Sequence, residues 1–232
     1  LKEELIAIRD KYGDERKTEI QDVFDEIDIE DLIPEEECVY TMTHNGYIKR
    51  LPASEYRAQN RGGRGVRAMS TREEDYVETI FTASTHDFLL LFTSRGQVYK
   101  RKGYMIPEAG RTAKGTNIAN IIPVRSGEKL SAGLHMSQLP EDRFLVFVTR
   151  KGTVKRMSFE TLKNLKNIGI RAITLEEGDG LISVMQTDGS ENIMIATRNG
   201  LAIRFPESDV RVMGRSAVGV RGIRLRDDDD VP

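Results

Sequence analysis

The sequence predicts an all-β, propeller-like fold of about four blades, preceded by a short helical and acidic segment. Three observations predict it: a repeat of about 50 residues, a Thr-x-x-Gly turn in each repeat, and apolar runs rich in strand-forming residues before the turns. A repeat of this length with strand–turn–strand chemistry is typical of propeller blades rather than of helical solenoids. One small sheet cannot bury both of its faces alone, so the units are expected to pack in series.

The first segment, residues 1–34, is predicted to be the end of a helix followed by an acidic linker. Leu5 and Ile8 lie at roughly helical spacing among charged residues, and Gly13 interrupts the pattern. The segment contains 5 Lys and Arg residues against 12 Asp and Glu residues, which gives it a net charge of −7. Residues 35–232 are expected to form the β domain.

Each repeat is built around an anchor glycine, with other residue types at fixed distances from it. The anchors are Gly46, Gly96, Gly152 and Gly200. The residues three positions before them are Thr43, Thr93, Thr149 and Thr197. A second glycine follows each anchor 17 or 19 residues later, at Gly65, Gly115, Gly169 and Gly219. Each turn is expected to join two antiparallel strands, because glycine readily adopts the backbone angles that tight turns require. The four blades are expected near 38–83, 84–138, 139–187 and 188–232.

Basic residues recur at equivalent positions of the four units. The side chains four positions after the anchor glycines are Arg50, Lys100, Arg156 and Arg204. Adjacent or otherwise repeated positions add Arg101, Lys155, Arg67, Arg171 and Arg221. Radial repetition of the units would turn these residues into a positive belt around the rim. The alternative is that Lys and Arg on the solvent face of a strand only block edge-to-edge pairing, but four units with the same offset and sign favour the belt.

The charge of the chain is divided unevenly along its length, although the whole chain has a formal net charge of −2. Residues 38–226 carry a net charge of +12 between two acidic flanks, Glu35–Glu37 and Asp227–Asp230. A basic body suggests a polyanionic partner, whereas the alternative is that charges of both signs simply solvate the surface. Aromatic residues make up only 6% of the chain and tryptophan is absent, which leaves little for single-stranded bases to stack on. Duplex DNA is therefore the favoured polyanion.

The most informative motif is the heptad Gln59-Asn60-Arg61-Gly62-Gly63-Arg64-Gly65. Its glycines allow a partner to approach the backbone closely, and its two arginines carry forked donors that match phosphate geometry. A flexible basic loop is the alternative for the motif taken alone.

The heptad resembles the box motif of DNA gyrase A, whose usual form is Gln-Arg-Arg-Gly-Gly-Lys-Gly. Arg64 replaces the lysine and Asn60 replaces the first arginine, while the other five positions match. Residues 10–20 are also similar to the gyrase segment that leaves the helical part of the cleavage core. Over essentially its whole length, the chain thus resembles the C-terminal DNA-wrapping domain of this family.

The resemblance implies a β-pinwheel, a propeller-like disc in which neighbouring blades exchange strands. It implies sequence-nonspecific binding, bending and wrapping of duplex DNA around a basic rim. The chain would be the non-catalytic C-terminal part of an ATP-dependent type II topoisomerase that introduces negative supercoils, and its partners in a heterotetrameric holoenzyme would be gyrase B and the rest of gyrase A. The catalytic residues, ATP and Mg²⁺ would belong to other parts of this holoenzyme, which would lie in the bacterial cytoplasm with the nucleoid. The expected DNA-binding residues are Gln59, Asn60, Arg61, Gly62, Gly63, Arg64, Gly65, Arg50, Lys100, Arg101, Lys155, Arg156, Arg204, Arg67, Arg171 and Arg221.

Nothing in the sequence indicates a catalytic centre, a metal site or a membrane span. The single cysteine, Cys38, has no partner for a disulfide or for zinc, and we expect it to be a small buried residue at the start of a strand. The run Asp227–Asp230 is interpreted as a solvated charge run. Two other functions stay open: a topoisomerase IV-type module that bends DNA without strong wrapping, and a propeller that binds other proteins.

Overall fold

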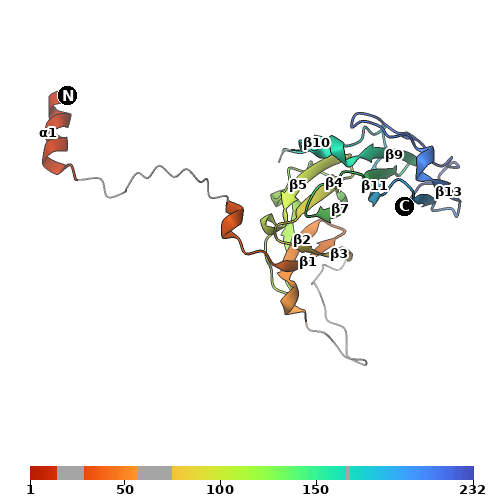
Figure 1. Ribbon diagram of the computed structural model, residues 1–232, viewed down its shortest axis with the longest axis horizontal. Coiled ribbons are helices and arrows are strands. Elements are labelled where there is room, and N and C mark those ends of the chain that lie inside the picture. The colour runs from red at the N-terminus through yellow and green to blue at the C-terminus, as the bar shows by residue number, and fades with distance from the viewer. Residues whose placement is uncertain (15–28, 57–74, 166–167) are drawn as a thin grey trace. The chain divides into compact units, whose positions relative to one another are not determined.

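The computed structural model describes residues 1–14, 29–56, 75–165 and 168–232 (Figure 1), which fall into an N-terminal segment, 1–33, and a β domain, 34–232. In the N-terminal segment, helix α1 (Lys2–Tyr12) lies where the sequence predicts a helix and is followed by Gly13. The 3-10 helix η1 (Ile29–Leu32) is the other element of this segment over its described residues. None of the helices in the described part of the chain is both long and apolar enough to cross a membrane.

The β domain is all β over its described residues, with three four-stranded antiparallel sheets and one two-stranded sheet. The first sheet, in the order β3-β1-β2-β6, contains β1 (Glu37–Thr43), β2 (Tyr47–Pro52), β3 (Val77–Ser84) and β6 (Thr116–Asn117). The second sheet, in the order β10-β5-β4-β7, contains β4 (Phe88–Thr93), β5 (Gln97–Lys102), β7 (Leu130–Met136) and β10 (Ile170–Arg171).

The third sheet, in the order β11-β8-β9-β14, contains β8 (Phe144–Thr149), β9 (Thr153–Ser158), β11 (Leu181–Thr187) and β14 (Val220–Arg221). The fourth sheet is the hairpin of β12 (Asn192–Ala196) and β13 (Ala202–Pro206). Short 3-10 helices follow the strands at η2 (Ala53–Glu55), η3 (Gly103–Met105), η4 (Ile118–Asn120), η5 (Phe159–Leu162) and η6 (Glu207–Asp209). The all-β prediction is therefore confirmed.

Neighbouring units exchange short strands. β6, β10 and β14 each follow a second glycine, and each pairs with the hairpin of the preceding unit. Arg171 of β10, for example, lies opposite Gln97 of β5. A Cβ atom at Gly115 would lie 2.6 Å from the carbonyl oxygen of Ile48, so the close approach before β6 requires glycine. The exchange confirms the β-pinwheel that the resemblance implies.

The Thr-x-x-Gly turns join antiparallel strands, as predicted. In the first turn, the Gly46 amide donates to the Thr43 carbonyl at 2.9 Å, and the Tyr47 amide donates to the Thr43 hydroxyl at 3.1 Å. The φ angle of Gly46 is 78°, in the left-handed region that favours glycine. The same two hydrogen bonds recur at Thr93, Thr149 and Thr197. Local turn chemistry thus explains why both residue types repeat.

Aspartates from later in the chain fasten three of these turns. The side chains that accept a hydrogen bond from a turn amide are Asp75, Asp179 and Asp229, at 3.0, 2.9 and 3.0 Å. Asp230 also pairs with Arg198 of the fourth turn at 2.6 Å. The interpretation of Asp227–Asp230 as only a solvated charge run is therefore wrong for its last two residues.

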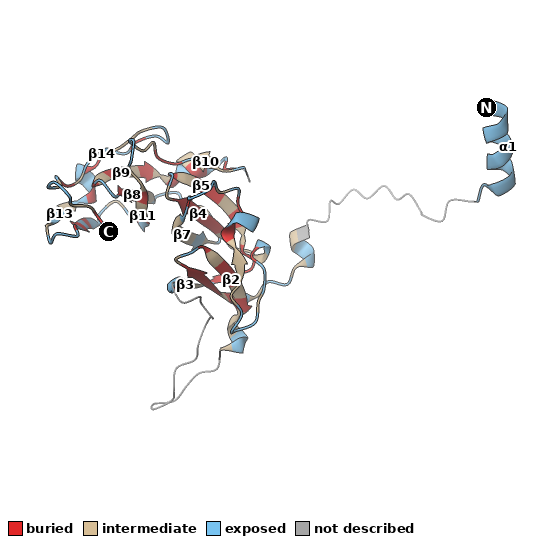
Figure 2. Cartoon of the chain, turned by 180° about the vertical axis from the view of Figure 1, so that it is seen from behind, coloured by how far each residue is buried: buried red, intermediate tan, exposed pale blue. Residues whose placement is uncertain are grey.

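Three apolar cores lie between successive sheets. Alternate residues of β4 point to opposite sides: Leu89 packs in the core shared with the first sheet, and Leu90 in the core shared with the third. Because both faces of this strand are buried (Figure 2), its sequence is a continuous apolar run rather than an alternating one. In β12, by contrast, Ile193 is buried and Met194 is 67% exposed. Cys38 is fully buried in β1, as expected, and burial raises the pKa of its thiol.

Candidate nucleic-acid interface

The repeated basic residues of the hairpins occupy one register but not one environment. Each of the four lies opposite the residue six positions before the anchor glycine of its unit, as Arg50 lies opposite Tyr40 and Arg204 opposite Met194. Only Arg204 among these four is exposed. The predicted equivalence of position therefore does not produce four equivalent charges at the surface.

Arg50 and Arg156 are largely buried between units and are paired with carboxylates. Arg50 contacts Glu36 at 3.4 Å and Glu108 at 3.2 Å, and its side chain is only 15% exposed. Arg156 lies 3.6 Å from Glu207, which is fully buried. Both arginines connect a hairpin to other parts of the chain, and their charges are already balanced. The expectation that they belong to a free positive belt is corrected by this pairing.

Lys100 and Arg101 are also held inside the domain. The ammonium of Lys100 lies 3.6 Å from the centre of the Phe88 ring, and burial lowers the pKa of Lys100, with the charge of Lys102 acting in the same direction. Arg101 is 9% exposed, and its Nε donates to the carbonyl of Ile121 at 3.0 Å. Burial lowers the pKa of Arg101 as well. Neither side chain is placed as an open phosphate contact.

Lys155 is fully buried, so its assignment to a solvent-facing belt is wrong for the structure as described. Its Nζ donates to the carbonyls of Ala172, Arg215 and Ala217 at 2.6, 2.8 and 3.2 Å. Burial lowers the pKa of Lys155 to about 8. Lys49 is equally buried, and its Nζ donates to three carbonyls of the next unit.

The remaining predicted residues divide into two groups. Arg171 and Arg221 are exposed on the exchanged strands β10 and β14, where the sequence repeat places them. The heptad Gln59–Gly65 and Arg67 lie outside the described residues. Within the described chain, three predicted arginines thus face solvent: Arg171 and Arg221 on exchanged strands, and Arg204 on the fourth hairpin.

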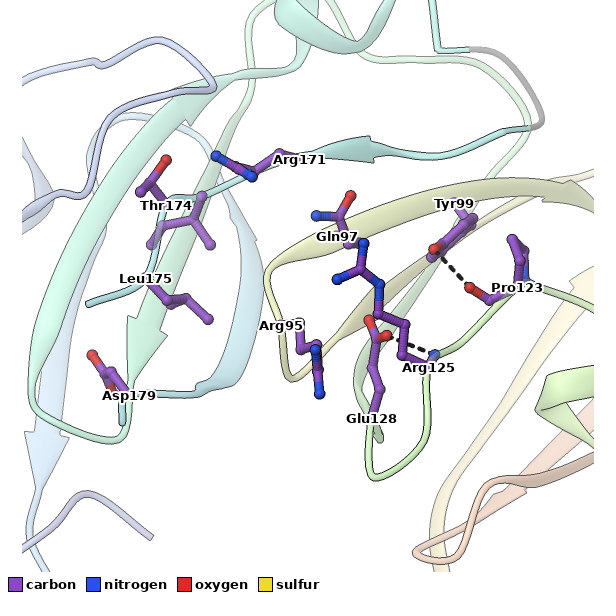
Figure 3. A pocket seen from close by; sticks show the side chains of 11 residues that line it. Arg95, Gln97, Tyr99, Pro123, Arg125, Glu128, Arg171, Thr174, Leu175 and Asp179 are labelled. Carbon is purple, nitrogen blue, oxygen red and sulfur yellow. Dashed lines mark hydrogen bonds between the residues drawn. The ribbon is translucent and has the colours of Figure 1, made fainter. Parts of the chain in front are cut away.

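Arg171 shares a cavity of about 530 Å³ with Arg95 and Arg125 (Figure 3). The three arginines come from different elements: the second hairpin turn, the loop before β7 and the exchanged strand β10. All three are exposed, and within the described chain no side-chain hydrogen bond or ion pair engages their guanidinium groups. Gln97 lies beside them as the strand partner of Arg171.

Both carboxylates of this cavity accept hydrogen bonds from backbone amides, although the second oxygen of Glu128 has no partner among the described residues. Glu128 accepts a hydrogen bond from the Arg125 amide at 2.9 Å. Asp179 accepts from the amides of Lys151 and Gly180 at 2.9 and 2.8 Å. Because both carboxylates fasten turns, the cavity presents guanidinium donors for an external anion. Forked guanidinium donors match the oxygens of a phosphate group.

A second cavity of about 560 Å³ extends this surface to the fourth unit. It is lined by Arg171 and Gln97, which it shares with the first cavity, and by Arg215. We name Arg95, Arg125, Arg171 and Arg215 the arginine track. One unit later, Arg221 and Lys151 line a further cavity of about 350 Å³, which Glu176 also lines. The ammonium of Lys151 donates to the carbonyl of Glu177 at 2.6 Å, so Arg221 is the cation of this cavity whose side chain has no partner among the described residues.

Sequence reasoning identified only Arg171 of the arginine track. Arg95 stands directly before an anchor glycine, as Lys151 does in the next unit, and this repeated position was an available signal. Arg125 lies in a loop that recurs in the third and fourth units, where Glu176 and Arg226 occupy its position. The sign of the charge at this position is not repeated, so the folded arrangement is needed to show the role of Arg125. Arg215 lies four residues before a second glycine, at the position that Arg61 has in the heptad.

The fold and this surface define a strand-exchanged β-propeller with a cationic edge. A family model described as the DNA gyrase C-terminal domain, a β-propeller, matches residues 39–84, 87–134, 143–188 and 191–231. The chain belongs to this family of DNA gyrase C-terminal domains.

Similar proteins are consistent with this assignment. The chain is 51% identical over 222 residues to the DNA gyrase A protein of Clostridium acetobutylicum, covering 96% of this chain and 27% of that protein. It is 50% identical over 233 residues to the DNA gyrase A protein of Staphylococcus aureus, covering 100% of this chain and 26% of that protein. The chain therefore spans about a quarter of the length of these relatives.

Two solved structures share the fold. The C-terminal domain of DNA topoisomerase IV matches with a TM-score of 0.72 and 29% identity, over 86% of this chain and 60% of that one. A DNA gyrase A C-terminal domain matches with a TM-score of 0.66 and 26% identity, over 84% of this chain and 63% of that one.

Proposed function

We propose that this chain binds duplex DNA without regard to base sequence, and that it bends and wraps the duplex along the edge that carries the arginine track. The observation that supports this most directly is the set of four exposed guanidinium groups in connected cavities, with no carboxylate partner among the described residues. Contacts of this kind recognise the regularly spaced phosphates rather than the bases.

Several such contacts are needed to wrap DNA. Bending about 20–30 base pairs tightly costs on the order of several kcal/mol. Each phosphate contact contributes by releasing condensed counterions, and the contributions add along the path. The arginine track, together with Arg221 of the next exchanged strand, offers such a series. The heptad Gln59–Gly65 would add a further contact from the first unit.

The length of the relatives supports a place for this function in a larger enzyme. In our proposal the chain is the C-terminal part of an ATP-dependent type II topoisomerase that introduces negative supercoils. The strand-cleaving residues and the ATP and Mg²⁺ sites belong to parts of the enzyme outside this chain, and the partners are gyrase B and the rest of gyrase A. The enzyme acts in the bacterial cytoplasm, on the nucleoid.

Ligation of nicked circular DNA in the presence of the full chain tests wrapping. Wrapped DNA should be sealed with a changed linking number, and the change should grow with the ratio of protein to DNA. The triple variant Arg125→Ala, Arg171→Ala and Arg215→Ala should reduce the change. Arg143→Ala is the matched control, because Arg143 is also exposed but is paired with Asp188. An unchanged linking number with saturating protein would exclude wrapping.

The second candidate is a topoisomerase IV-type module that bends DNA without strong wrapping. The TM-score of 0.72 with the topoisomerase IV domain, against 0.66 with the gyrase domain, favours it, as does Asn60 in place of a basic residue in the heptad. This module would bring the ends of a short duplex together in a fluorescence-transfer experiment and leave the linking number unchanged. Failure to retain duplex DNA at moderate salt would instead favour a protein-binding propeller.

A further inference from the structure

Two buried lysines hold loops of the following unit from beneath. Lys49 of β2 donates to the carbonyls of Gly110, Arg111 and Ala113 at 3.0, 2.7 and 3.0 Å. Lys155 of β9 does the same for Arg215 and Ala217, with Ala172 as its third acceptor. Each lysine lies three positions after an anchor glycine, and each is fully buried. We name residues 110–115 the second-unit loop and residues 214–219 the fourth-unit loop.

The two loops share a sequence pattern with each other. They read Gly-Arg-Thr-Ala-Lys-Gly and Gly-Arg-Ser-Ala-Val-Gly, and both end at a second glycine that precedes an exchanged strand. Their arginines, Arg111 and Arg215, are exposed, although their carbonyls are bound from within. The backbone is thus fixed on one side while the guanidinium group is presented on the other.

The corresponding loop of the third unit lacks both the lysine of the preceding unit and the arginine. The position of the lysine is occupied by Tyr99, whose hydroxyl donates to the carbonyl of Pro123 at 3.2 Å. The position of the loop arginine is occupied by Leu165, which is buried. Among the three loops that precede an exchanged strand in the described chain, an exposed arginine in the loop therefore occurs only where a buried lysine of the preceding unit binds the loop.

The ammonium group contributes something that an apolar side chain would not. A methionine of similar length would fill the same space without the cost of removing a charge from water. Three carbonyls satisfy the three donors of a lysine, so the charge fixes the direction of three peptide groups of a loop. In the fourth-unit loop, that direction accompanies the placement of Arg215 in the cavity that also contains Arg171.

We propose that Lys49 and Lys155 are positioning residues that hold Arg111 and Arg215 in place to contact the phosphates of duplex DNA. The second and fourth units then each carry a phosphate-binding loop, and the third unit does not. This inference rests on the proposed binding of duplex DNA, and it assigns the loop contacts to alternate units.

A double-mutant cycle on the full chain tests the positioning role, with binding to a random-sequence duplex measured by fluorescence anisotropy. Arg215→Ala should weaken binding by roughly 3- to 10-fold and lower the slope of log affinity against log salt by about 1. Lys155→Met should weaken it similarly, and the double variant should be no weaker than Arg215→Ala alone. Arg95→Ala, which alters an arginine outside the loop, should instead add its full effect to that of Lys155→Met.

Controls separate positioning from general stability. Lys163→Ala, which removes an exposed lysine from the third unit, should leave affinity within about 2-fold of the unmodified chain. Lys155→Met should speed amide exchange in the fourth-unit loop and leave exchange in β8 and β9 unchanged. If Lys155→Met does not fold, the cycle of Lys49→Met with Arg111→Ala gives the same test.

Additive losses for Lys155→Met and Arg215→Ala would overturn the proposal, as would faster exchange throughout the third sheet. The proposed function fails in a different way, because the unmodified chain would then not bind duplex at all. In that case, faster exchange confined to the fourth-unit loop would still show that Lys155 holds this loop, and only the contact of the loop with DNA would be overturned.

Discussion

Arg156 and Arg171 are both predicted DNA contacts, and the structure gives them opposite environments. Arg156 lies on a hairpin strand, 12% exposed and within 3.6 Å of the buried Glu207. Arg171 lies on an exchanged strand, exposed and in a cavity with two other arginines. Both residues recur in the repeat with the same sign of charge. A repeated basic position therefore does not by itself show whether the side chain holds two units together or is available to bind a partner.

The difference follows from where each strand lies in its sheet. The hairpin strands of the second and third sheets are packed between two neighbouring sheets, so a charge there must be balanced by a carboxylate, a ring or several carbonyls. An exchanged strand closes the edge of a sheet, where side chains remain in water and cost little to keep charged. Balanced charges hold the units together, and unbalanced charges are available to an external polyanion.

Replacing Glu207 by alanine should give the largest effect on stability. Glu207 accepts hydrogen bonds from the Thr187 hydroxyl at 2.6 Å and from the amides of Gly189 and Glu191, and it balances Arg156. Its loss leaves a largely buried charge and several donors without a partner, so the free energy of unfolding should fall by about 3–5 kcal/mol. Urea denaturation measures this change. Glu160→Ala is the control, because its pair with Lys163 is exposed and is worth less than about 1 kcal/mol.

A smaller effect is expected from raising the pH. Burial lowers the pKa of Lys155 to about 8 in the folded chain, whereas an unfolded lysine keeps its ordinary value near 10.5. Between these values the unfolded chain binds more protons, so Lys155 makes the free energy of unfolding rise with pH. Compared with Lys155→Met, the unmodified chain should gain on the order of 1–3 kcal/mol between about pH 7 and pH 10. Parallel stability curves for the two proteins would show that Lys155 does not titrate in this range.

The arginine track should matter for binding and not for folding. In the variant Arg125→Ala with Arg171→Ala, the slope of log affinity against log salt should fall by about 2, because two phosphate contacts are lost. The free energy of unfolding should change by less than about 0.5 kcal/mol per substitution, since both side chains are exposed and unpaired within the described chain. Salt titrations of DNA binding, with denaturation as a parallel measurement, distinguish the two properties. A loss of stability without a change of slope would mean that these arginines hold units together, as Arg156 does, and do not contact DNA.

The smallest effect on the free energy of unfolding is expected at Arg204. This residue tests whether the register of an arginine or its burial decides its role. Arg204 has the register of Arg50 and Arg156 but lies in the fourth, two-stranded sheet and is exposed. Arg204→Ala should change the free energy of unfolding by less than about 0.5 kcal/mol, whereas Arg50→Ala removes the partner of two carboxylates and should cost more. Thermal denaturation of the two variants provides the measurement. Equal losses would mean that register, rather than burial, decides the role.

The turns and strands could be predicted because their causes are local in sequence. A threonine and a glycine three residues apart form the hydrogen bonds of each turn within five residues, as at Thr43, Gly46 and Tyr47. The continuous apolar runs of β4 and β8 reflect burial on both faces, which a sequence records directly. The heptad was equally visible, but it lies outside the described residues, and its contact with DNA stays a prediction.

The sequence by itself determined the number of repeated units, their turns and strands, and the burial of Cys38 at the start of a strand. These features depend on residues close together in the chain, and the family followed from the match of the heptad to a known motif. Only the tertiary structure decided which basic residues are free. Lys155 is buried because carbonyls 17 to 62 residues further along the chain surround its ammonium. Arg95, Arg125 and Arg171 form one surface because strand exchange brings a strand of the third unit to the hairpin of the second. Charge is a property of a residue, but its availability depends on what the fold places around it.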